Sequence, residues 1–126
     1  MDPLWFIRLP FAVTFVGHGI GKLVMPYATA ALLDLPLSLT VLVGVAEVLA
    51  GIGAVVGGIE RAPRRALIDR LTGLAAVPVL LGAIALVHWP RWSFVASDSH
   101  PLGGMEFQVL LLGVALYLLL GSWRRV

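Results

Sequence analysis

The sequence predicts an all-α integral membrane protein, a four-helix bundle with its N- and C-termini on the cytoplasmic side. Three observations lead to this prediction. Hydrophobic residues make up 60% of the 126-residue chain, and only 13% of residues are charged, whereas a soluble domain usually carries roughly a quarter. The chain contains four apolar stretches of about 20 residues, the length that crosses a bilayer. Its Lys and Arg residues are distributed unequally between the connecting segments.

Prolines and charged residues divide the chain into four expected helices, about 4–25, 37–59, 70–89 and 105–122. Met25-Pro26 closes the first helix and Pro36 opens the second. The charged segment 60–65 separates the second helix from the third, and Trp89-Pro90 closes the third. The polar segment 93–104 is expected to form a loop before the fourth helix. We expect residues 1–126 to form a single membrane domain.

The orientation is predicted from the flanks of these helices. Seven arginines fall on one side, against one lysine and one arginine on the other: Arg8, Arg61, Arg64, Arg65, Arg70, Arg124 and Arg125 against Lys22 and Arg91. Basic flanks stay in the cytoplasm, so the arginine-rich side is expected there, in a multi-pass protein of the cell (inner) membrane. With a formal net charge of only +2, we expect the arginines to set topology and not to bind nucleic acid.

Small residues and a proline suggest how the helices pack. Gly17 and Gly21, and again Gly53 and Gly57, have the Gly-x-x-x-Gly spacing that lets membrane helices approach closely. Pro78 is expected to kink the third helix because proline removes one backbone hydrogen bond.

Five ionisable residues fall inside or at the ends of the expected spans: His18, Lys22, Glu47, His88 and Glu106. A charged group at mid-bilayer costs roughly 2.5 to 3.5 kcal/mol even on insertion scales, so each needs a reason to be there. His18 and Lys22 share one helix face because they are four residues apart. At about 1.5 Å per residue, all five lie in the middle and outer part of the bundle, which predicts a polar cavity opening toward the outer face.

Three interpretations of these residues remain open. In the first, Glu47 pairs with His18 or Lys22 and the network only ties the helices together. In the second, the cavity binds a quinone headgroup, whose carbonyl oxygens accept hydrogen bonds from His. In the third, two His and two Glu hold a metal ion, although the tight spacing of a motif such as His-Glu-x-x-His is missing. Cysteine is absent, which excludes disulfides and thiolate metal sites.

Three motifs together resemble the DoxX/DoxD family: Gly17-His18-Gly19-Ile20-Gly21-Lys22-Leu23, Gly44-Val45-Ala46-Glu47-Val48-Leu49-Ala50-Gly51, and the fourth helix from Glu106-Phe107 onward. The similarity covers most of the chain in length, helix number and motif order. It implies a four-helix membrane protein related to the small membrane subunit of thiosulfate:quinone oxidoreductase. His18, Lys22, Glu47 and Glu106 match family motif residues, and His88 matches more weakly.

The expected function is therefore a DoxX-like membrane subunit of a respiratory or redox complex, or an anchor for one. It would have no cofactor of its own, and its five ionisable residues would contribute to a quinone pocket. No catalytic or metal-binding residue is predicted, and we do not expect an autonomous enzyme. Expected partners are lipids, the other subunits of the complex and further copies of the chain. A purely structural or assembly subunit is the alternative, and a small transporter comes third.

Overall fold

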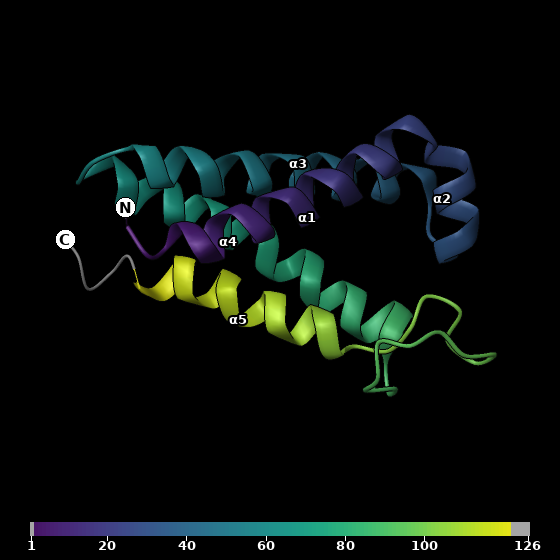
Figure 1. Ribbon diagram of the computed structural model, residues 1–126. Helices are drawn as coiled ribbons and strands as arrows, with labels where there is room; N and C mark the ends of the chain where they lie inside the picture. The colour runs from purple at the N-terminus through teal and green to yellow at the C-terminus, as the bar shows by residue number, and fades with distance from the viewer. Residues whose placement is uncertain (1, 122–126) are drawn as a thin grey trace.

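The computed structural model describes residues 2–121, and this part of the chain is helical with no strand. Its elements are α1 (Trp5–Val24), α2 (Pro26–Leu33), α3 (Leu37–Ile59), α4 (Arg64–Ala83), a single π-helical turn η1 (Ile84–His88), and α5 (Glu106–Gly121). The long helices pack in the order α1, α3, α4 and α5, each against the next. By contrast, α1 and α5 contact each other little. Figure 1 shows that α1 and α5 diverge toward one end of the bundle.

The two ends of the bundle differ in composition. The start of α1, the connection from α3 to α4, and the end of α5 lie together at one end (Figure 1), which we call the arginine end because Arg61, Arg64 and Arg65 lie there. The opposite end holds α2 and the irregular segment 89–105, and we call it the loop end. Lys22 and Arg91 belong to the loop end. The predicted residues Arg124 and Arg125 lie outside the described part of the chain.

Most expected helix boundaries agree with the structure to within one residue, but one boundary differs and one helix is additional. The second expected helix matches α3 at both ends. The third begins at Arg64, earlier than expected, because Arg64 and Arg65 form the first turn of α4. The short helix α2 was not predicted. Pro26 ends α1 but also starts α2, since proline fits the first turn of a helix, and the chain bends by 107° between them.

Within the described residues, two helices are long and apolar enough to cross a membrane, α3 and the continuous helix Arg64–His88. The bent pair α1 and α2 is a third candidate if it counts as one span, and α5 is apolar but shorter over its described length. Large apolar side chains such as Phe6, Val13 and Leu110 are mostly exposed. Apolar helices of this length with such an apolar surface indicate a membrane protein.

The interior is built from small and aromatic side chains. Phe11 and Phe15 stack with ring centroids 4.4 Å apart, and fully buried alanines of α3, α4 and α5 fill the helix crossings. At the contact between α1 and α3, a Cβ atom on Gly19 would lie 2.6 Å from the carbonyl oxygen of Gly44. The close approach of these two helices therefore depends on Gly19.

One of the two Gly-x-x-x-Gly patterns does not pack as expected. A Cβ atom on Gly17 or Gly21 would meet nothing within 4 Å, because these residues face away from α3 while Gly19 between them contacts it. The other pattern does pack, since Gly53 lies against Thr72 and Gly57 against Asp69. Pro78 does not end α4, which continues to Ala83 before the π-helical turn.

Candidate functional site

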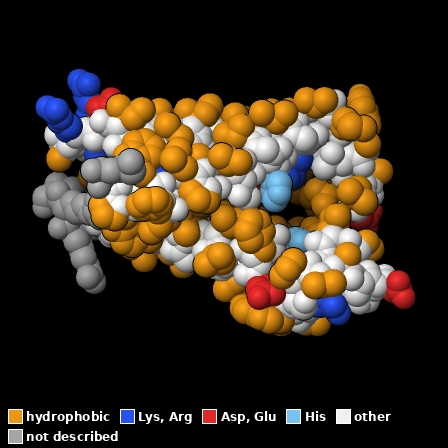
Figure 2. Space-filling model, viewed as in Figure 1, with side chains coloured by type: hydrophobic (Ala, Val, Ile, Leu, Met, Phe, Trp, Pro, Cys, Tyr) orange, Lys and Arg blue, Asp and Glu red, His pale blue; other side chains and the backbone are white. Residues whose placement is uncertain are grey.

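A cavity of about 600 Å³ lies at the loop end of the bundle. Side chains of α1 and α3 form one wall, and α4, η1 and α5 form the other. Residues of α2, among them Ala28, Thr29 and Leu32, close it toward the loop end. Figure 2 shows the surface hollowed between α1 and α5, with histidine side chains at the edge. The cavity thus opens sideways along the α1–α5 seam, and it is mostly apolar.

An ion pair between α1 and α3 is the most polar part of this cavity. The ammonium nitrogen of Lys22 lies 2.8 Å from Oε2 of Glu47 and donates a hydrogen bond of 3.1 Å to Oε1. Gly44, one turn before Glu47, faces the Cβ of Lys22, so a small residue leaves room for the lysine stem. The pair lets two charged groups stay within the bundle, because each offsets the burial cost of the other.

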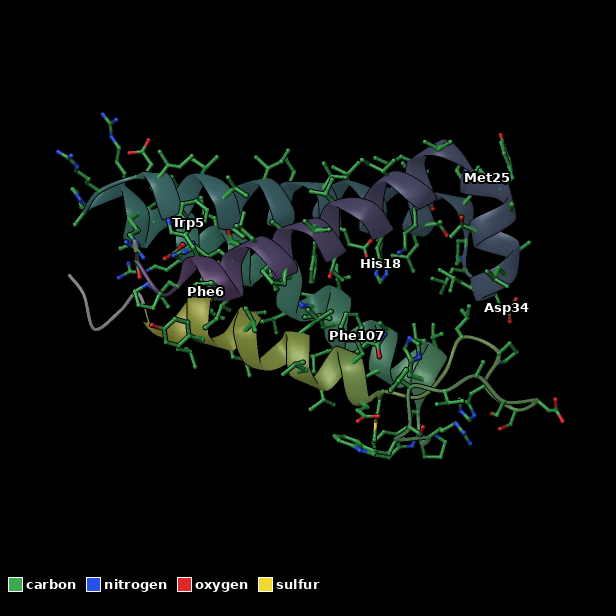
Figure 3. All side chains as sticks on the ribbon, viewed as in Figure 1. Trp5, Phe6, His18, Met25, Asp34 and Phe107 are labelled. Carbon is green, nitrogen blue, oxygen red and sulfur yellow. The ribbon has the colours of Figure 1, made fainter. Side chains whose placement is uncertain are left out.

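His18 lies one turn before Lys22 on α1 and points toward the space between α1 and α5 (Figure 3). Its side chain lines the cavity but remains exposed. Among the described residues, the ring nitrogens of His18 have no hydrogen-bond partner. Glu47 pairs with Lys22 and not with His18. The imidazole of His18 is therefore available to a bound molecule.

His88 reaches the cavity from the π-helical turn. Its Nδ1 lies 2.7 Å from the carbonyl oxygen of Gly103, and since a carbonyl oxygen only accepts, Nδ1 carries the proton and donates. Gly103 has a φ of +82°, and a Cβ atom there would collide with the backbone of Phe94, so only glycine fits. In the neutral ring, Nε2 is then left as an acceptor.

Glu106 does not join the other four predicted residues. It starts α5, and its Oε2 accepts a 3.3 Å hydrogen bond from the backbone N–H of Phe94. It lines a neighbouring cavity, which His18 also lines, and not the one that contains Lys22 and Glu47. The structure thus brings together His18, Lys22, Glu47 and His88 and leaves Glu106 beside them.

Gln108 is a cavity residue that sequence reasoning missed. It lies on α5 and lines the cavity, and its Oε1 is buried with no hydrogen-bond partner among the described residues. A buried amide oxygen without a partner is costly, so this position can accept a hydrogen bond from a bound molecule. An amide in an apolar helix one turn from Leu111 and Leu112 was the available signal.

Three cavity glycines leave open space. Gly17 and Gly21 on α1 and Gly82 on α4 line the cavity, and a Cβ atom on any of them would meet nothing within 4 Å. Their small size therefore widens the cavity without serving a helix contact.

A second buried ion pair, at the arginine end, was also missed. The guanidinium of Arg8 binds Asp69 through two hydrogen bonds of 2.8 and 2.7 Å and donates a third, of 2.9 Å, to the carbonyl oxygen of Ala54. Arg8 had been assigned to topology alone, and Asp69 fell just before the expected third span. Asp69 is the only acidic residue between Arg61 and Ser97, which was the available signal.

A more exposed contact lies nearby. Asp2 accepts a 2.8 Å hydrogen bond from Arg65 and a 3.0 Å bond from the backbone N–H of Leu4. The Arg65 hydrogen bond is the main cause that lowers the pKa of the Asp2 carboxyl below its ordinary value.

Within residues 2–121, no three His, Asp or Glu side chains gather closely enough to hold a metal ion. Glu106 does not line the cavity that Glu47 and His88 line, so the four ligands that the metal interpretation needs do not surround one space.

Comparison of the chain with protein-family models, with curated proteins and with solved structures gives no match. The resemblance to the DoxX/DoxD family therefore remains a prediction from the motifs.

Proposed function

We propose that the chain is a four-span protein of the cell (inner) membrane, with the arginine end in the cytoplasm. Its cavity binds a quinone headgroup, and the protein acts as a DoxX-like subunit of a membrane redox complex or as an anchor for one. The observation that carries this proposal is the cavity of about 600 Å³ beside the Lys22–Glu47 pair. Ligand pockets are typically about 300–1,000 Å³, mostly apolar, with a few polar groups.

The polar groups suit the edge of a quinone ring. Lys22 and the imidazole N–H of His18 offer donors to carbonyl oxygens, whereas Gln108 offers a buried acceptor to a hydroxyl of the reduced ring. The ion pair is neutral as a whole, which favours an uncharged ligand over an ion. The glycines at positions 17, 21 and 82 leave space for a flat ring among apolar walls.

A structural or assembly subunit is the second candidate, and the direct Lys22–Glu47 contact favours it. A purely structural network is expected to be dry and closed, with no cavity beside it. The open cavity, the partnerless ring of His18 and the buried oxygen of Gln108 are features that such a network does not need.

The test uses purified protein in mild detergent, with its partner subunits where they co-purify. Quinone binding is measured for the wild type, His18→Ala, Glu47→Gln and Gly21→Leu. We expect Gly21→Leu to fold and to lose binding, because Gly21 lines the cavity and a Cβ atom there meets nothing within 4 Å, so the larger side chain takes up cavity space. The matched control is Gly113→Leu on α5, which also has open space at its Cβ but lies outside both cavities. Folded variants that bind quinone as the wild type does would leave the protein as a structural subunit.

Topology is tested separately because the chain has no cysteine of its own. Single cysteines at Ala62, in the α3–α4 connection, and at Ser97, in the loop, should be labelled from opposite sides of sealed vesicles. Labelling of both from the same side contradicts the four-span arrangement.

A further inference from the structure

A second cavity of about 700 Å³ adjoins the first along α5. We call the cavity beside Lys22 the inner cavity, and we call this second one the outer groove. His18, Leu102 and Gln108 line both. These three residues therefore lie between the two spaces.

The outer groove differs from the inner cavity in chemistry. Its remaining residues are mainly large and apolar: Trp92, Phe94, Phe107, Val109 and Leu110. No lysine or arginine lines it, and its one carboxylate, Glu106, accepts the backbone N–H of Phe94. Phe94 and Leu110 are 64% and 66% exposed, so the groove runs out onto the apolar surface of the bundle. Such a surface suits a hydrocarbon chain.

We infer that one amphipathic molecule occupies both spaces: its ring headgroup lies in the inner cavity, and its hydrocarbon chain passes His18, Leu102 and Gln108 and lies in the outer groove. This inference rests on the proposed function and adds the class of ligand, a quinone with a long apolar chain. The adjacency of the two cavities carries it, because only His18, Leu102 and Gln108 line both the inner cavity and the groove that runs out onto the apolar surface of α5.

The residues shared by the two spaces fit the same arrangement. His18 and Gln108 are the polar groups at the point where the ring meets the chain. Each has a side chain without a hydrogen-bond partner among the residues that the structure describes, at Oε1 in the case of Gln108. They would contact the ring oxygen nearest to the chain, while Lys22 and Glu47 lie deeper.

The experiment compares two quinones that share the same ring, one without a chain and one with a chain of several isoprene units. Binding is measured with purified protein in detergent. We expect the long-chain quinone to bind about tenfold more tightly, a difference of roughly 1.4 kcal/mol. Val109→Trp fills the groove from its exposed wall and should remove that difference while the chainless quinone binds as before. Leu116→Trp is the matched control, since it lies two turns along the same face of α5, outside both spaces.

The outcomes separate the two proposals. If neither quinone binds the wild type, both the proposed function and this inference fail. If both bind with equal affinity, or if Val109→Trp weakens both equally or neither, the chain does not lie in the groove. In that case a loss of binding in Gly21→Leu would still support the inner cavity as the headgroup site.

Discussion

The part of the bundle that the structure describes contains two buried ion pairs, one near each end, and they are built differently. At the arginine end, Arg8 and Asp69 meet through two hydrogen bonds, and their side chains are 2% and 7% exposed. Gly57 packs against this pair, which leaves no space beside it. At the loop end, one ammonium faces the carboxylate of Glu47, and Lys22 is 14% exposed beside a cavity.

This difference shows that a buried ion pair can either fix the helix geometry or leave a charged group free to move. A bidentate pair enclosed on all sides fixes the geometry of α1, α3 and α4, because a guanidinium and a carboxylate match in shape. A lysine has a flexible stem and three rotatable donors. Beside a cavity it can turn from Glu47 toward a bound molecule, and the enclosed arginine has no such freedom.

The largest expected effect is at the closed pair. Arg8→Leu leaves the carboxylate of Asp69 buried without a partner, which should lower the free energy of unfolding by about 3–5 kcal/mol. Thermal unfolding in detergent measures this, with Arg61→Leu as a control at an exposed arginine of the same end. The double variant Arg8→Met/Asp69→Leu should recover most of the loss, since it removes both charges. Equal stability of Arg8→Leu and Arg61→Leu would contradict the comparison.

The next largest difference in stability is expected between substitutions on the two faces of α1. Gly19→Ala places a methyl group against the backbone of Gly44 and should cost about 2 kcal/mol through separation of α1 and α3. Gly17→Ala on the same helix meets open space and should be neutral or stabilising by up to about 1 kcal/mol, because alanine favours helix over glycine. Unfolding midpoints of both variants are compared, and a greater loss for Gly17→Ala would reverse the assignment of faces.

At the open pair, Glu47→Leu should cost about 1 kcal/mol, near the lower end for a partnerless buried donor, because Lys22 can take water from the cavity. Glu47→Gln should cost less, since the amide keeps a hydrogen bond to Lys22. Thermal unfolding and assembly with partner subunits are both measured. A loss as large as that of Arg8→Leu would mean that the two pairs are equally enclosed, and no loss in stability or assembly would remove Glu47 from both the network and the site.

The smallest effect concerns the exposed pair of Asp2 and Arg65. Because the pKa of Asp2 is lower in the folded protein, its stabilising contribution is present above the pKa of the unfolded chain and is lost as pH falls through the folded value. The unfolding midpoint of Asp2→Asn should therefore approach that of the wild type in acid. Asp98→Asn, at an exposed carboxylate of the loop, is the control. A gap between Asp2→Asn and the wild type that widens in acid would contradict this sign.

The fold was largely predictable because proline and charge mark the ends of apolar helices. Pro36 and Glu60 bound α3 as expected. The site was partly predictable, since His18 and Lys22 had to share a face and the helix order brings them near Glu47 and His88. Depth along a helix does not give its rotation, so Glu106 could be placed at the correct end but not on the correct face.

The features that the sequence did not predict have weaker signals in a single sequence. Gln108 has no charge, so the cost of burying it did not draw attention to it. Arg8 fits the pattern of a topology-setting arginine, and a sequence does not show that its guanidinium is almost fully buried against a partner on another helix. The short helix α2 was overlooked because Pro26 marks an end and a start at once.

The π-helical turn at Ile84–His88 makes the orientation of His88 depend on the number of residues before it in the helix. Such a turn contains one more residue than the α-helix it interrupts, and an α-helix rotates by about 100° for each residue. Loss of one residue between Pro78 and His88 would turn the histidine away from Gly103 and from the cavity. Homologous chains that keep this histidine should therefore tolerate no insertion or deletion in that stretch, and should vary in length at the exposed segment 95–99 instead.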